Sequence, residues 1–154
     1  RMKRLDKTTK LTEDSLSRLS KVDKPQVWLI LTEGWCGDAS QIIPVIEKMA
    51  AQSDFIETRY ILRDENLDVM DQFLTNGGRS IPKVASLNPE SLDVYADWGP
   101  RQVDVQKMVM DAKKAHQENP GSVSFEEVKT NVQRWYNTDK TIKIQQELLD
   151  GLLK

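Results

Sequence analysis

Five consecutive apolar residues, VWLIL at 27–31, limit the fold of this chain more than any other segment. Lys24-Pro25 precedes the run and Gly34 follows it, so the segment has the length of a strand and not that of a helix. Successive side chains of a strand point to opposite faces, so this one needs apolar partners on both sides. The run therefore predicts an inner strand of a sheet that helices cover on both faces.

The segments around this strand alternate between helical and extended patterns. Apolar residues have helical spacing at 12–21, from Cys36 to about Gln52, around 67–74, over 105–115, from Ser124 and over 139–152, and strands are expected at 55–62, 83–87 and 92–97. A helix joins the first two strands, which makes them parallel, whereas the short turn NPES makes the last two antiparallel.

The expected fold class is therefore α/β. We expect a mixed sheet in the order β-α-β-α-β-β-α with helices on both faces, one N-terminal helix and two extra C-terminal helices. The 154 residues suit one domain, 1–154. The chain breaks at Asn119-Pro120-Gly121, and the apolar faces beyond it predict a helical extension, 119–154, packed on the core.

Composition argues against several classes of partner. The net charge is −2 and no apolar run is long enough to span a bilayer, so neither nucleic acid nor membrane is an expected partner. One cysteine excludes an internal disulfide and a cysteine-rich metal site, and the single histidine has no second ligand near it. We expect no metal and no cofactor. No signal peptide is recognisable, so the expected location is cytoplasmic, although a trimmed signal would leave the same sequence.

The only cysteine lies in a segment that resembles the thioredoxin family. WCG at 35–37 follows the buried strand and opens a helix, and Pro44 lies eight residues past Cys36, where the family has a proline that kinks this helix. RSIP at 79–82 is similar to the family segment that carries a cis-proline, and Gly99 stands where a family glycine borders the substrate groove. The resemblance covers residues 25–116, which we expect to form a thioredoxin-like core.

The resemblance implies the residues of the site. Cys36 would be the catalytic nucleophile. A cis peptide bond before Pro82 would expose the backbone of Ile81 to an extended chain, which would bind by strand addition. The expected substrate-binding residues are Trp35, Gly37, Ile81, Pro82 and Gly99.

Three departures from the family pattern change the expected chemistry. Ala39 occupies the position of the second cysteine, and Asp38 stands where many members have proline. Ile30 replaces a buried aspartate that the family uses for proton transfer. Reduction by a dithiol is therefore unavailable to this chain.

Two neighbours of the thiol are expected to modulate it. If Cys36 caps its helix, the amides of Asp38 and Ala39 and the helix dipole favour the thiolate, whereas the Asp38 carboxylate opposes it. Ser40 either bonds the sulfur or has no chemical role. Farther along the chain, Arg101 is interpreted as solvated, with ligand contact as the alternative, and Tyr136 as a packing residue.

Three functions remain open at this point. The leading hypothesis is monothiol exchange with a protein or small-molecule thiol or disulfide, which needs an external resolving thiol because Cys36 has no partner in the chain. The alternatives are a redox-inactive adaptor domain that keeps the cis-proline groove and a redox sensor modified at Cys36. Enzymatic activity depends on whether this thiol is accessible and partly ionised.

Overall fold

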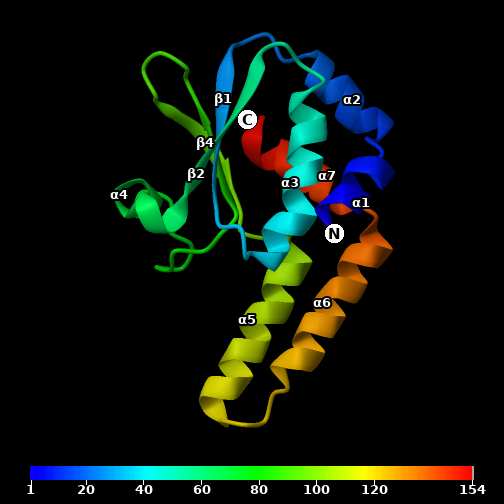
Figure 1. The fold of residues 1–154 in the computed structure, drawn as a ribbon, viewed down its shortest axis with the longest axis vertical. Coiled ribbons are helices and arrows are strands. Elements are labelled where there is room, and N and C mark those ends of the chain that lie inside the picture. The colour runs from blue at the N-terminus through cyan, green and yellow to red at the C-terminus, as the bar shows by residue number, and fades with distance from the viewer. Residues whose placement is uncertain (154) are drawn as a thin grey trace.

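A computed structural model describes residues 1–153 and contains the predicted mixed sheet (Figure 1). The strands are β1 (Gln26–Thr32), β2 (Ile56–Leu62), β3 (Lys83–Leu87) and β4 (Val94–Trp98). Their order in the sheet is β2-β1-β3-β4. β1 pairs with β2 in parallel and with β3 antiparallel, and β3 pairs antiparallel with β4. The α/β fold class is therefore confirmed.

β1 is covered on both faces, as its apolar sequence predicts. Trp28 and Ile30 belong to one buried cluster, to which α2 (Glu13–Ser20), α3 (Gly37–Ala50) and α7 (Ile142–Leu152) contribute. Leu31 points the other way, into a smaller cluster with Met70 from α4 (Leu67–Met70) and Phe73. The larger cluster is the main core of the molecule.

Three local features differ from the sequence prediction. α1 (Met2–Thr8) was not expected, because Leu5 is its only buried residue and the segment has no apolar period. α4 ends at Met70 and not near residue 74, and a short turn follows in which the amides and carbonyls of Thr75 and Gly78 pair at 2.9 Å. β4 begins at Val94 because Leu92, with φ 61°, still belongs to the preceding turn.

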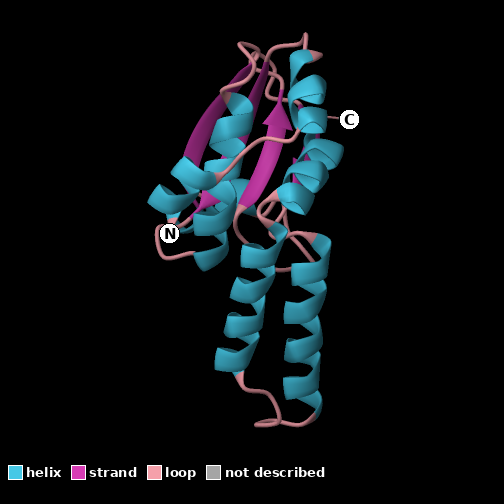
Figure 2. Ribbon diagram, turned by 90° about the vertical axis from the view of Figure 1, so that its right-hand side faces the viewer, coloured by secondary structure: helices cyan, strands magenta, loops and turns pink. Residues whose placement is uncertain are grey.

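α5 (Val103–Glu118) and α6 (Phe125–Asp139) form a pair that extends past one end of the sheet (Figures 1 and 2). Val105 is the only buried residue of α5, and Tyr136 is the only one of α6. Both lie at the end of the pair nearest the sheet. α7 then returns to the body of the protein, where its buried residues join the main core.

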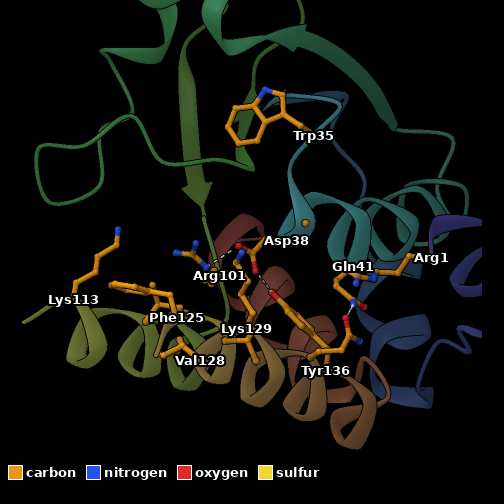
Figure 3. Close-up of a pocket in the computed structure, with 14 residues that line it drawn as sticks. Arg1, Trp35, Asp38, Gln41, Arg101, Lys113, Phe125, Val128, Lys129 and Tyr136 are labelled. Atoms are coloured by element: carbon orange, nitrogen blue, oxygen red, sulfur yellow. Dashed lines mark hydrogen bonds and ion pairs between the residues drawn. The ribbon is translucent and has the colours of Figure 1, made fainter. Parts of the chain in front are cut away.

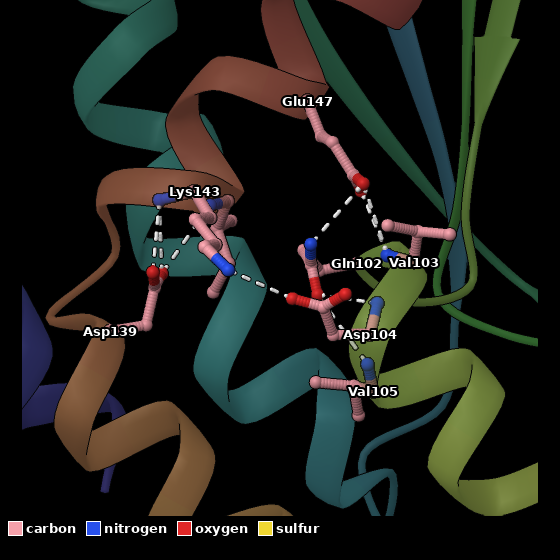
Figure 4. Close-up of polar contacts among 8 residues, drawn as sticks. Gln102, Val103, Asp104, Val105, Asp139, Lys143 and Glu147 are labelled. Carbon is pink, nitrogen blue, oxygen red and sulfur yellow. Dashed lines mark hydrogen bonds and ion pairs between the residues drawn. The ribbon is translucent and has the colours of Figure 1, made fainter.

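Polar contacts fix the start of α5 to α7 (Figure 4). Both carboxylate oxygens of Glu147 accept from the backbone amide of Val103 at 3.1 Å, and the Gln102 side chain donates to Glu147 at 3.3 Å. Lys143 pairs with Asp104 at 2.9 Å. The first amides of a helix have no hydrogen-bond partner within the helix, and Glu147 provides one for the Val103 amide. Together with the pairing of Lys143 and Asp104, this contact holds the start of α5 against α7.

Gly99, between β4 and α5, is where we expect the backbone to tolerate no other residue. Its φ is +127°, and a Cβ there would collide with the carbonyl oxygen of Pro82 and lie 3.2 Å from the α-carbon of Lys83. Gly77 is a matched control, because its φ is also positive (+76°) but nothing lies within 4 Å of an added Cβ.

We predict that Gly99→Ala lowers the free energy of unfolding by about 3 kcal/mol, whereas Gly77→Ala lowers it by about 1 kcal/mol. The control carries only the cost of the backbone conformation, and Gly99→Ala adds the collision. Urea denaturation followed by circular dichroism measures both values. Equal losses in the two variants would contradict the close packing of Gly99 on Pro82.

Candidate functional site

Cys36 caps the N-terminus of α3, as the sequence suggested. Its sulfur accepts a hydrogen bond from the Ala39 amide at 3.5 Å and donates to the Ile81 carbonyl at 3.6 Å. The structure pairs the sulfur with the amide of Ala39 and not with that of Asp38. Only 8% of Cys36 is exposed, so the thiol lies just beneath the surface.

The segment that faces the thiol is firmly held. The peptide bond between Ile81 and Pro82 is cis, and both residues are buried. Gly99 packs against the backbone of Pro82 and Lys83. The Lys83 side chain is buried too; it pairs with Asp97 at 2.8 Å and donates to the Gly99 carbonyl at 3.3 Å. Cys36, Ile81, Pro82 and Gly99 thus form one contiguous region.

Trp35 presents an aromatic surface beside the buried thiol. The residue is 68% exposed, and the guanidinium carbon of Arg63 lies 5.2 Å from the centroid of its ring. Arg63 also donates to the Arg79 carbonyl at 3.1 Å, which places it next to the segment that leads to Ile81. No local pattern predicts this contact, because Arg63 lies 28 residues after Trp35 in the sequence.

The Asp38 carboxylate is engaged on both oxygens (Figure 3). One oxygen pairs with the Arg101 guanidinium at 2.8 Å, and the other accepts from the Tyr136 hydroxyl at 2.8 Å. The side chains of Asp38 and Arg101 are 15% and 19% exposed. The interpretation of Arg101 as solvated is therefore wrong, and Tyr136 has a polar role besides packing. Because Arg101 offsets the charge of Asp38, the aspartate opposes a neighbouring thiolate less than its position in the sequence suggested.

Tyr136 keeps its proton in this arrangement. Burial raises the pKa of the phenol, and the charge of Asp38 and the hydrogen bond to it raise the pKa further. The hydroxyl therefore remains a donor to Asp38 throughout the physiological range. Ser40 is turned away from the thiol's chemistry, since its hydroxyl donates to the Gly37 carbonyl at 2.6 Å.

Within residues 1–153, no three side chains of the His, Cys, Asp and Glu types gather closely enough to hold a metal ion. No helix of the same range has both the length and the apolar character that a membrane span requires.

We predict that Arg101→Gln destabilises the protein by about 2–3 kcal/mol, because it leaves a largely buried carboxylate without its cation. In the Asp38→Asn/Arg101→Gln double variant the loss should be smaller than the sum of the single losses by about 1 kcal/mol or more. Urea unfolding of the four proteins gives this coupling energy.

The exposed pair of Arg79 and Asp71, 2.7 Å apart at its closest, is the control. Its side chains are 48% and 45% exposed, so Arg79→Gln should cost less than about 1 kcal/mol. A coupling energy between Asp38 and Arg101 no larger than that of this surface pair would show that the site does not depend on their interaction.

Comparison with known proteins relates the chain to one family. A family model described as thioredoxin matches residues 1–114. No curated protein matches the chain. A protein of unknown function from Pseudomonas aeruginosa, with a crystal structure at 1.5 Å, has a TM-score of 0.60 and 21% identity over 76% of this chain and 72% of its own.

An HIV epitope scaffold is also similar in structure. Its TM-score is 0.62 at 16% identity, over 95% of this chain and 82% of the scaffold. At such low identities the two crystal structures show a shared fold and no more. The family match extends from residue 1, so it includes the two N-terminal helices that the resemblance at 25–116 left outside.

Proposed function

The chain belongs to the thioredoxin family, and from this premise we propose that it carries out thiol–disulfide exchange with Cys36 as its single nucleophile. The observation that carries the proposal is the position of the sulfur. It lies at the N-cap of a 14-residue helix, accepts the Ala39 amide, and faces the carbonyl that precedes the cis bond to Pro82.

The surroundings of the sulfur support a reactive thiolate. The unpaired amides at the start of a helix stabilise a negative charge by about 0.3–1 kcal/mol in exposed sites and by up to about 2 kcal/mol in partly buried ones. Asp38 would cancel this gain, but its charge is countered by Arg101 at 2.8 Å. The N-cap amide and the pairing of Asp38 with Arg101 are therefore the two features of the site that support exchange at Cys36.

The reaction is an exchange with no net transfer of electrons. The Cys36 thiolate attacks one sulfur of a substrate disulfide, forms a mixed disulfide with it, and releases the other sulfur as a thiolate. An external low-molecular-weight thiol then attacks the substrate sulfur of the mixed disulfide. Cys36 leaves as a thiolate, and the substrate keeps a disulfide to the external thiol.

The substrate would lie across Trp35 and the segment 81–82. An extended chain would add to the backbone of Ile81 and contact Pro82, while the exposed ring of Trp35 would cover its apolar side chains. Gly37 lies in the first turn of α3, next to Cys36, and Gly99 packs against the backbone of Pro82. Residues Trp35, Gly37, Ile81, Pro82 and Gly99 would thus act in binding.

A binding domain without turnover is a second candidate, and one observation favours it. Cys36 is 8% exposed, whereas Trp35 is 68% exposed, so the surface offers more for binding than for attack. Such an adaptor would keep its partner in the Cys36→Ser variant. A redox sensor would instead retain a modification on Cys36 after the oxidant is removed.

The rate of Cys36 alkylation by iodoacetamide between about pH 5 and 10 tests the proposal. Because this is the only cysteine, the whole signal in intact-mass spectrometry belongs to it. We predict that the rate at pH 7 equals or exceeds that of an unstructured peptide with one cysteine.

Labelling at the peptide's rate or faster supports the proposal only if the protein is folded during the reaction. Circular dichroism of the same samples establishes this. A rate at pH 7 well below the peptide's, or no labelling until the protein is unfolded in urea, would contradict catalysis. The adaptor would then be the better account of the site.

A further inference from the structure

A hollow of about 500 Å³ lies between the α5–α6 pair and the first turn of α3 (Figure 3). Trp35 and Asp38 lie on one side of it, and Phe125 and Val128 lie on the other. Cys36 is not part of its lining, although both neighbours of Cys36 are. The proposed exchange reaction does not use this hollow, which has the size of a site for a small molecule.

The walls contributed by α5 and α6 carry four apolar side chains. Val109 comes from α5, and Val128 and Val132 come from the facing side of α6. Phe125, at the start of α6, is 42% exposed. Beyond their bases these two helices bury no residue fully, so they leave apolar surface in contact with water. An aliphatic group in the hollow would remove that surface from water, which is favourable in proportion to the area covered.

The charges around the hollow favour an anion. The only carboxylate in its lining is that of Asp38, and this group is already engaged by Arg101 and Tyr136. Three cationic side chains remain: Lys113 from α5 and Lys129 from α6 lie beside the apolar residues, and Arg1 lies at the opposite end of the hollow (Figure 3). Lys129 pairs with Glu126 at 3.1 Å, whereas Lys113 makes no ion pair within residues 1–153. About one positive charge, that of Lys113, is thus available beside the apolar residues, which suits a monoanion such as a carboxylate there.

We infer that this hollow binds a small aliphatic carboxylate. Its chain lies against the valines of α5 and α6, and its carboxylate pairs with Lys113. This binding does not depend on the redox state of Cys36. Because the hollow adjoins Trp35, an occupant would lie beside the proposed substrate groove.

Isothermal titration with decanoate, below its micelle-forming concentration, tests the inference. We expect binding of one molecule with a dissociation constant on the order of 100 µM. Decyltrimethylammonium has the same chain and the opposite charge, so it should bind at least about tenfold more weakly. No binding of decanoate would overturn the inference, and so would equal affinity for the two amphiphiles.

Lys113→Ala and its neighbour Lys114→Ala separate the site from general surface charge. Both residues are on α5, but Lys114 pairs with Glu118 and does not line the hollow. Lys113→Ala should weaken decanoate binding about fivefold or more, whereas Lys114→Ala should leave it unchanged. Equal effects of the two would contradict the assignment of the carboxylate to Lys113.

Two further variants test the apolar wall and the independence from the thiol. Val128→Thr preserves the size of the side chain but places a hydroxyl on the wall, and it should weaken binding about threefold. Cys36→Ser should bind decanoate as the unchanged protein does, while it loses alkylation. Loss of decanoate binding in Cys36→Ser would contradict a separate site, and this outcome is distinguishable from failure of the proposed exchange.

Discussion

The Asp38 carboxylate, held between Arg101 and Tyr136, is the interaction on which the geometry of the site depends. Asp38 lies in the first turn of the helix that Cys36 caps. Arg101 follows Gly99 by two residues, and Tyr136 belongs to the last turns of α6. One side chain thus joins the thiol's helix, the region behind the cis-proline and the C-terminal helices. The Asp38 carboxylate, whose charge would oppose a thiolate at Cys36, is thus also the group that holds these elements together.

Ala39 stands at the position of the family's second cysteine, so the remaining groups of the site have other roles than in a dithiol protein. Ala39 contributes only its backbone amide to the sulfur of Cys36. Trp35 and the segment at 81–82 lie beside the thiol, so the residues of the proposed groove are present although the chain has only one cysteine. In the proposed exchange, an external thiol would complete the cycle. The hollow beyond Asp38 adds a second surface of contrasting chemistry, apolar with a cationic edge.

Local patterns were sufficient to predict the elements that carry the site. The apolar run at 27–31 identified the inner strand, because only a strand covered on both faces has no polar side. Pro44 was recognisable from the helical spacing around it, and Gly99 from the resemblance to the thioredoxin family. Such features depend on neighbours close in the sequence or on one backbone conformation, so a sequence displays them directly.

The partners of Asp38 could not be predicted in the same way. Arg101 is 63 residues away and Tyr136 is 98 residues away, and no local pattern links them. The position of the α5–α6 pair relative to the sheet could not be predicted either. Apolar spacing shows that a helix has an apolar face, but it does not show which element covers that face. Ser40 shows the same limit at short range. The sequence left open whether its hydroxyl bonds the Cys36 sulfur, and in the structure the hydroxyl donates to the Gly37 carbonyl.

The most direct measurement is the rate of Cys36 alkylation at pH 7 in three folded proteins: the unchanged chain, Arg101→Gln, and Asp38→Asn/Arg101→Gln. If Arg101 offsets the charge of Asp38, its removal should slow alkylation about tenfold, and removal of both charges should restore the rate. Equal rates in all three would show that the thiol does not respond to this pair. The proposed link between the framework of the site and its chemistry would then be wrong.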